Sequence, residues 1–153
     1  MLFRSVFQSR YRGERKKIEE LILELNLKDH VRLIGWVNYS KLPAYFATAD
    51  IFIGPSIQTN NGDREGFGLT FAEAISSECI VIASDLPAIK DIIIENQTGF
   101  IVKQKSSKAI SDKVIELIKF GDNLEIFKDR GRKFAKQNFD WKTISTKYGR
   151  LLK

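Results

Sequence analysis

Hydrophobic and polar positions follow two different periods along the chain. Some segments repeat apolar residues every three to four positions, as amphipathic helices do, and others contain short continuous apolar runs, which are typical of buried strands. The predicted helices cover 14–26, 40–48, 69–77 and 88–95, followed from 106 by a helical region broken near 121 and near 139–140. The predicted strands cover 31–34, 51–54, 79–83 and 100–102. Because apolar strands alternate with helices, we expect a single α/β domain, a Rossmann-like, doubly wound parallel sheet with helices on both faces.

The composition fits one globular domain. The chain has 153 residues, of which 43% are hydrophobic and 29% charged, and a domain of this length can bury one sizeable core. Four late aromatic residues are assigned to that core: Phe120, Phe127, Phe134 and Phe139. No apolar run approaches the ~20 residues of a membrane span, and the first residues lack the apolar region of a signal peptide. Cys79 is the sole cysteine, so no internal disulfide can form, and we expect a cytoplasmic chain.

The basic residues gather toward the two ends, and the net charge is +6. The early group is Arg10, Arg12, Arg15, Lys16 and Lys17, and the late group is Lys128, Arg130, Arg132, Lys133 and Lys136. Solvated helix faces explain such groups most simply. An anionic membrane surface or a lipid-phosphate acceptor is the second interpretation, with the protein held peripherally at the membrane. Nucleic acid is disfavoured, because no recognition motif accompanies the charge.

One segment combines the features of an anion site. It starts at Gly54, where a predicted strand ends, and leads through a polar loop to the predicted helix at Leu69. Doubly wound sheets bind ligands at the carboxyl ends of their strands. Gly66 and Gly68 let the backbone approach a ligand closely, and the first amides of a helix lack internal partners. Together with the helix dipole, such amides suit a phosphate group.

Two carboxylates accompany this helix start. Glu65 precedes it, and Glu73 lies eight positions later, about two turns into the predicted helix. Eight steps of ~100° return to within ~80° of the same face. Because ionised carboxylates accept hydrogen bonds from hydroxyl groups, the pattern suits a diphosphate joining two hydroxyl-rich ends, as in a nucleotide sugar. On spacing alone, Glu73 is more simply a solvated helix residue and Glu65 a helix amino-terminal charge. A dinucleotide fingerprint is excluded because Phe71 stands where a third glycine is needed, and a Walker-type Gly-Lys-Ser/Thr is absent.

The residues from Glu65 to Glu73 resemble the Glu-x7-Glu motif of retaining glycosyltransferases of the GT-B fold, the group 1 or family 4 type. The resemblance extends outward through 31–37, 49–56 and 81–102, and covers 13–153 in all. It implies that the chain is the carboxy-terminal, nucleotide-sugar-binding half of such an enzyme. The implied reaction transfers a hexosyl group, with retention of configuration, to a saccharide or lipid-linked acceptor, as in polysaccharide biosynthesis.

The resemblance also implies a role for each matched position. Glu65, the catalytic candidate, would bind hydroxyls of the donor sugar, and Glu73 would bind the ribose. The diphosphate would lie on the backbone amides of Gly66, Phe67, Gly68, Leu69 and Thr70. The nucleobase would lie near Gly35, Trp36 and Leu42. No metal or other cofactor is expected, because in this fold amides and cationic side chains stabilise the leaving diphosphate.

The sequence departs from the family pattern at its start. The carboxy-terminal domain normally opens with a strand, a Gly-Arg turn and a downstream lysine. We therefore regard the amino-terminal strand or strands as missing or degenerate, and interpret 1–12 as a degenerate or truncated start and 13–153 as the domain. The amino-terminal acceptor domain is missing too, and His30, in a predicted turn, cannot replace its histidine. A last helix is expected from about residue 140. In full enzymes it crosses to the other domain, so its apolar face would be exposed here.

Smaller departures surround the candidate site. Residues 76–80 replace a small-Gly-x-Pro-Val turn, Asp91 stands where glutamate is usual, and Pro87-Ala88 replaces a glycine pair. Two functions stay open: a donor-binding domain that is inactive without an acceptor domain, and a non-catalytic remnant or nucleotide-binding module of the same fold. A flavodoxin-like receiver is disfavoured, because Asp50 precedes its strand instead of following it.

Overall fold

The computed structural model describes residues 3–5, 12–121 and 124–152. The chain forms two compact units, Met1–Leu42 and Pro43–Lys153. Most of the start that the sequence marks as degenerate or truncated, 1–12, lies outside the described residues.

A two-stranded parallel sheet and one helix make up most of the first unit. Strand β1 (Phe3–Ser5) pairs with β2 (Val31–Leu33), and α1 (Arg12–Glu24) connects the two. A short 3-10 helix, η1 (Tyr39–Lys41), follows. A strand that the sequence led us to regard as missing or degenerate therefore exists over three residues.

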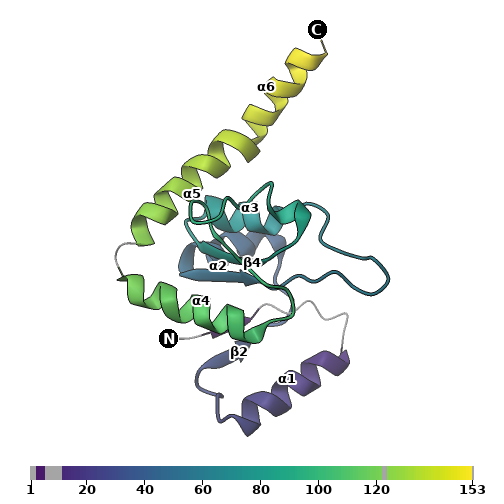
Figure 1. Ribbon diagram of the computed structural model, residues 1–153, viewed down its shortest axis with the longest axis vertical. Coiled ribbons are helices and arrows are strands. Elements are labelled where there is room, and N and C mark those ends of the chain that lie inside the picture. The colour runs from purple at the N-terminus through teal and green to yellow at the C-terminus, as the bar shows by residue number, and fades with distance from the viewer. Residues whose placement is uncertain (1–2, 6–11, 122–123, 153) are drawn as a thin grey trace. The chain divides into compact units, whose positions relative to one another are not determined.

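The second unit is built around a three-stranded parallel sheet (Figure 1). Its strands, in the spatial order β3-β4-β5, are Ile51–Gly54, Ile80–Ser84 and Phe100–Val102. Its helices are α2 (Leu42–Thr48, beginning at the last residue of the first unit), α3 (Leu69–Ser76), η2 (Pro87–Ile89), α4 (Ser107–Phe120), α5 (Leu124–Phe139) and α6 (Trp141–Leu151). Because Ile51 pairs with Ile80 and Ile82 with Phe100 in parallel, the carboxyl ends of the three strands share one edge.

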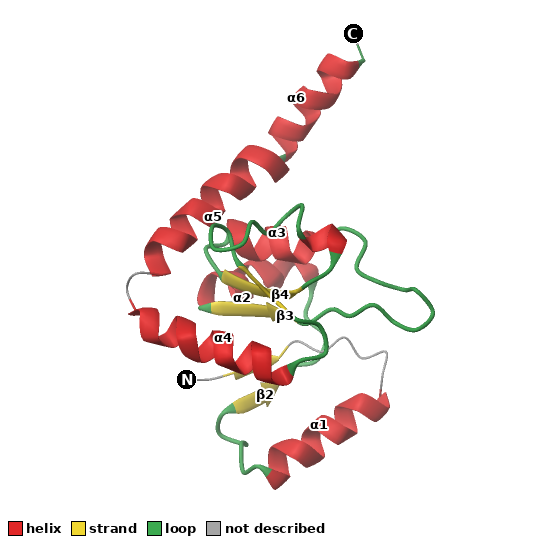
Figure 2. Ribbon diagram, in the orientation of Figure 1, coloured by secondary structure: helices red, strands yellow, loops and turns green. Residues whose placement is uncertain are grey.

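Helices cover both faces of this sheet, with α3 and α4 on opposite sides (Figure 2). One face holds a cluster in which strand residues meet α4: Ile80, Ile82, Phe100, Val102, Val114 and Leu117. On the other face, the Phe52 ring makes edge contacts with Phe46 of α2 and Phe71 of α3, at centroid distances of 5.4 and 5.7 Å. Side chains alternate between the faces along each strand, so β4 is buried over its whole length. The doubly covered parallel sheet predicted from the sequence is confirmed.

The prediction of a helix over 88–95 is wrong. Only the short 3-10 turn η2 forms there, and the chain continues in turns. The cause is the buried hydroxyl of Thr98, which accepts a hydrogen bond from the Ile94 amide at 2.9 Å and donates one to the Ile92 carbonyl at 3.3 Å. These bonds satisfy backbone groups that a helix would have used, while Ile92 and Ile93 remain buried.

The last helix leads away from the sheet of the second unit (Figure 1). Helix α6 packs chiefly against α5 and has no buried residue. Asp140 caps its amino end by accepting a hydrogen bond from the Lys142 amide at 2.9 Å. Within the described ranges, no helix has both the length and the apolar character needed to cross a membrane.

Candidate functional site

The candidate segment leaves the carboxyl end of β3 and returns as α3. The two are held together at the Phe71 ring, which lies against two glycines. A Cβ atom on Gly54 would lie 2.2 Å from Phe71 Cε1, and one on Gly68 would lie 2.6 Å from Cδ2. Gly68 also has a φ of +80°, which disfavours a side chain. Glycine at both positions therefore lets the start of α3 sit directly on the end of β3.

The amino end of α3 presents backbone donors. The Gly68 amide donates a hydrogen bond to Glu65 Oε1 at 3.0 Å, and the Phe71 amide donates to the Gly68 carbonyl at 2.9 Å. The amides of Leu69 and Thr70 have no partner among the residues that the structure describes, and both residues are exposed. Unpaired first-turn amides together with the helix dipole form a place for an anion. The structure thus leaves the predicted helix tip open.

The two carboxylates lie on different parts of this segment. Helix α3 begins at Leu69, so Glu65 lies outside it and the helical count over eight positions does not relate the pair. Glu65 instead folds back through its bond to Gly68, and its second oxygen can still accept hydrogen bonds. Glu73 is the fifth residue of α3, just over one turn into the helix, where the sequence suggested about two turns. Both residues are half-buried.

Gln104 ties together the loops that follow all three strands of the second unit. It lies two residues beyond β5. Its Oε1 accepts a hydrogen bond from the Gln58 amide at 3.0 Å, and its Nε2 donates to the Asp85 carbonyl at 2.6 Å. Gln58 belongs to the polar loop before the candidate site, whose predicted turn closes through a 2.8 Å bond from the Thr59 amide to the Asp63 carbonyl. Sequence reasoning missed Gln104, because neither partner is near it in the chain.

The residues predicted to lie near the nucleobase belong to the first unit. Gly35 follows β2, is buried and has a φ of +75°. Trp36 is exposed beside it, and Leu42 is the first residue of α2. The other predicted site residues, 65–70 and 73, belong to the second unit.

The departures around the site have modest structural effects. At the end of α3, the Cys79 amide bonds the Ala74 carbonyl and the Glu78 amide bonds the Ile75 carbonyl, both at 3.1 Å, which makes a Schellman cap with Glu78 in the left-handed region. Asp91 is exposed.

Burial, with a smaller contribution from Asp50, raises the pKa of the Cys79 thiol from 9.0 to about 12. A thiol that stays protonated at neutral pH cannot serve as a nucleophile.

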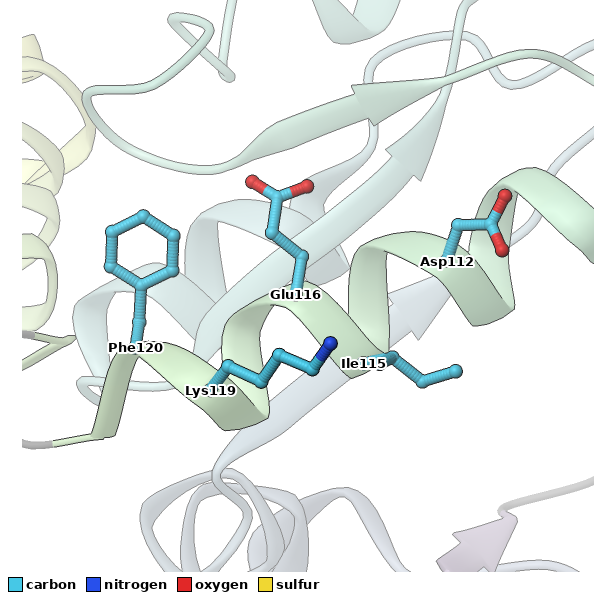
Figure 3. A pocket seen from close by; sticks show the side chains of 5 residues that line it. All are labelled: Asp112, Ile115, Glu116, Lys119 and Phe120. Carbon is cyan, nitrogen blue, oxygen red and sulfur yellow. The ribbon is translucent and has the colours of Figure 1, made fainter.

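A separate open hollow of about 520 Å³ lies on α4 (Figure 3). It is lined by Asp112, Ile115, Glu116, Lys119 and Phe120. Its two carboxylates are already paired, Asp112 with Lys108 and Glu116 with Lys113, each at 2.8 Å. Phe120, which we assigned to the core, is exposed here because α4 ends at it, whereas Phe127, Phe134 and Phe139 are half-buried. The hollow contains no predicted site residue.

In the described part of the chain, no three acidic, histidine or cysteine side chains lie in a group that could hold a metal ion. The site is therefore described by its backbone amides, its two glutamates and its glycines. A doubly wound α/β fold with an open helix tip at the carboxyl end of a strand defines the class of nucleotide- and phosphate-binding domains.

Known proteins resemble this chain over most of its length. A phosphatidylinositol monomannoside mannosyltransferase of Mycobacterium tuberculosis, described as GDP-mannose-dependent and α-(1-6)-specific, is 30% identical over 89% of this chain and 36% of its own. The solved C-terminal domain of a group 1 glycosyl transferase (LpcC) from Francisella tularensis is 27% identical, with a TM-score of 0.75, over 87% of this chain and 66% of that one. Anabaena HepE, solved with UDP and glucose, has a TM-score of 0.81 at 20% identity, over 99% of this chain and 40% of that one.

The sequence model of the family "Glycosyl transferases group 1" matches residues 11–134. The chain therefore belongs to the glycosyl transferases group 1 family, and its fold is that of the C-terminal domain of the GT-B architecture. The chain spans about a third of the length of the mycobacterial relative.

Proposed function

We propose that this chain is the nucleotide-sugar donor-binding domain of a retaining glycosyltransferase. The observation that carries the proposal is the open tip of α3, where the unpaired amides of Leu69 and Thr70 lie beside the Glu65 carboxylate in a chain of this family. HepE was solved with UDP and glucose, and the mycobacterial relative is GDP-mannose-dependent. These relatives support a nucleoside diphosphate sugar as the ligand, and a hexose as its sugar.

The diphosphate, the sugar and the ribose of such a ligand each have a suitable group in the second unit. The diphosphate is an anion, so it suits the helix tip, where the dipole and the amides of Leu69 and Thr70 favour negative charge. Glu65 uses one oxygen for Gly68, and its second oxygen would accept hydrogen bonds from sugar hydroxyls. The carboxylate of Glu73 would accept hydrogen bonds from the ribose. Gly35, Trp36 and Leu42 stay assigned to the nucleobase by the family resemblance.

In the proposed sugar transfer, this domain stabilises the leaving diphosphate. When the bond between the sugar carbon and the diphosphate breaks, its electron pair stays on the diphosphate oxygen. Donors already aimed at that oxygen lower the barrier, because they need no reorganisation as the charge develops. The reaction proposed for the whole enzyme retains the configuration of the sugar carbon and needs no metal. Product stereochemistry read by NMR, and transfer in the presence of EDTA, test these two points.

Calorimetric titration of UDP, GDP and ADP tests the donor role. We expect weak binding of one nucleotide, and we expect Glu73→Ala to lose it, because a buried ribose hydroxyl without its acceptor is costly. Glu73→Gln tests the same group with less change in volume. Glu78→Gln, at the other end of α3 and exposed, is the matched control and should bind as the wild type does. Equal binding by Glu73→Ala and the wild type would remove Glu73 from the ribose role.

The proposed domain does not transfer sugar alone. The cleft of the GT-B architecture has a second wall, which the acceptor domain provides in full-length enzymes of this kind. We therefore expect transfer to a saccharide or lipid-linked acceptor only when an acceptor domain is present. Turnover of a nucleotide sugar by the purified chain would refute this. Binding without any transfer, even with an acceptor domain added, would favour the alternative of a non-catalytic nucleotide-binding module.

An anionic membrane surface is proposed as a second partner, because α6 has the composition of an interfacial helix. At ~100° per residue, its apolar side chains fall within an arc of about 100°. They are Trp141 and Ile144 of α6, with Tyr148, Leu151 and the following Leu152. The remaining arc carries Lys142, Lys147 and Arg150 with no acidic residue, and none of these cations is ion-paired within the described structure. Such helices lie in the headgroup region of anionic bilayers.

Vesicle sedimentation separates this partner from the acceptor domain. We expect the chain to bind phosphatidylcholine vesicles containing about a third phosphatidylglycerol, to bind neutral vesicles poorly, and to lose binding as salt rises. Replacing Lys142, Lys147 and Arg150 together by Gln should abolish binding, while the same change at Lys103, Lys105 and Lys119 should not. Absence of vesicle binding would leave the apolar face of α6 to the acceptor domain alone.

A further inference from the structure

Helix α5 lies antiparallel along the segment that carries the candidate site. Near its middle, Gly131 faces the end of α3, where a Cβ atom on Gly131 would come within 3.0 Å of Ile75 Cγ2. At its last residue, the Phe139 ring meets the Phe67 ring at 6.1 Å and an interplanar angle of 84°. Eight positions separate 67 from 75, and eight separate 131 from 139. On α5 the two contacts are ~12 Å apart along the helix axis, whereas on the other segment they lie at the end of α3 and in the loop that precedes it.

The Phe67 contact bears on the backbone of the candidate site. Phe67 stands between Gly66 and Gly68, and glycine has less intrinsic conformational restriction than any other residue. Its side chain is 46% exposed, and Phe139 is the ring that it meets in the described structure. Phe139 is itself held by Phe134, with centroids 5.7 Å apart. A chain of three rings therefore links the body of α5 to a loop that glycine would otherwise leave loose.

We propose that Phe139 is a positioning residue, which holds Phe67 and thereby orders the Gly66–Gly68 backbone before ligand binds. Its consequence for nucleotide affinity rests on the proposed donor function, whereas the ordering of the loop does not. A preorganised loop binds more tightly because less conformational entropy is lost on binding. Edge-to-face aromatic pairs are typically worth a factor of about 2 to 12 in an equilibrium constant.

Hydrogen exchange read by mass spectrometry tests the ordering directly, without any ligand. In Phe139→Leu, we expect the Gly68 amide, which is hydrogen-bonded to Glu65, to exchange about 2 to 12 times faster than in the wild type, as read in peptides that cover 65–69. Phe127→Leu is the matched control, because it removes a half-buried ring of the same helix that meets Phe100, at 5.6 Å, away from the site. Phe139→Tyr keeps the ring and should restore slow exchange. Equal exchange in the Phe139→Leu and Phe127→Leu proteins would overturn the proposal.

A double mutant tests whether Phe139 acts through Phe67. Phe67→Leu should speed exchange in 65–69 as Phe139→Leu does, and the double variant should be no faster than either, because both remove one contact. Additive effects would contradict a shared contact and overturn the proposal.

Nucleotide titration separates the positioning role from the proposed function. We expect Phe139→Leu to weaken the nucleotide diphosphate that the wild type binds by about 2- to 12-fold, with recovery in Phe139→Tyr. Faster exchange with unchanged affinity would overturn the claim that Phe139 positions the ligand-binding backbone. If no variant and no wild-type protein bound any nucleotide, the exchange result would still decide the ordering, and the proposed donor function would fail alone.

Discussion

Helices α3 and α6 are both amphipathic, yet the fold uses them in opposite ways. Four of the eight residues of α3 are buried, namely Phe71, Ala72, Ala74 and Ile75. None of the eleven residues of α6 is buried, although its apolar side chains share one side. The apolar face of α3 is filled by the sheet and α5, so only its polar features remain for a ligand. The apolar face of α6 packs only in part, chiefly against α5, and none of its residues is buried in the described fold.

The difference in burial between α3 and α6 is related to how the amino end of each helix is placed. Gly54 and Gly68 let α3 start against the sheet, and the small side chains of Ala72 and Ala74 let it lie close to its neighbours. Asp140 instead caps α6 immediately after α5 ends, and α6 continues away from the sheet (Figure 1). An apolar stripe in a sequence therefore predicts that one face of a helix will be covered. It does not predict which other element or partner covers that face.

The largest effect that we predict contrasts one residue from each helix. Ile75 is 2% exposed and packs against Gly131, so Ile75→Ala should lower the free energy of unfolding by about 2–5 kcal/mol. Leu151 in α6 is 81% exposed, so Leu151→Ala should stay within about 0.5 kcal/mol. Urea denaturation of the two variants measures both. Comparable losses would mean that the face of α6 is covered in solution, and a dependence on protein concentration would then identify self-association.

Two glycines provide the next contrast, at the start of α3. A Cβ atom on Gly54 would overlap the Phe71 ring, so Gly54→Ala should cost about 1–3 kcal/mol through overpacking. A Cβ atom on Gly66 would meet nothing within 4 Å, so Gly66→Ala should change stability by no more than about 0.5 kcal/mol. Thermal unfolding distinguishes them. A harmless Gly54→Ala would show that α3 can move off the end of β3, contrary to the close contact described above.

A smaller effect depends on pH and on the buried thiol at the end of α3. Because the pKa of Cys79 rises from 9.0 to about 12 on folding, the unfolded chain loses this proton first as pH increases. Stability is thus complete below pH 9 and falls above it, by about 1 kcal/mol between pH 9 and 10. Cys79→Ala should remove that part of the decline. An identical pH dependence in the variant and the wild type would show that the thiol titrates alike in both states.

Sequence reasoning recovered the elements whose signals are local. Strands β3 and β5 have the predicted bounds, and α3 ends one residue earlier than predicted, because apolar runs there are limited by glycine, proline or polar turns. The open tip of α3 was predictable for the same reason: Gly66, Gly68 and the helix start are adjacent in the chain. The relation of Glu65 to Glu73 was not, since a helical count across a loop has no physical basis.

The features that sequence reasoning missed depend on residues far apart in the chain. The helix predicted over 88–95 has the correct apolar spacing, but the side chain of Thr98 takes the backbone bonds that a helix would need. Gln104 joins loops 46 and 19 positions away. Phe139 reaches Phe67 only because α5 folds back along α3. Such partners follow from the fold, and local spacing contains no signal for them.

The smallest predicted effect concerns the carboxyl ends of the two helices. Helix α3 ends with Glu78 at a φ of +63°, whereas Leu152 after α6 has a φ of −94° and no such strain. Glycine adopts the left-handed region freely, so Glu78→Gly should remove about 1 kcal/mol of backbone strain. It also loses the half-exposed ion pair with Arg132, so the free energy of unfolding should rise by about 0.5 kcal/mol in all. Glu78→Ala loses the same ion pair but keeps a Cβ atom, so it should give no gain. If both variants changed the unfolding midpoint equally, the left-handed backbone at Glu78 would not be a source of strain. The different backbone conformations at the two helix ends would then have no effect on stability.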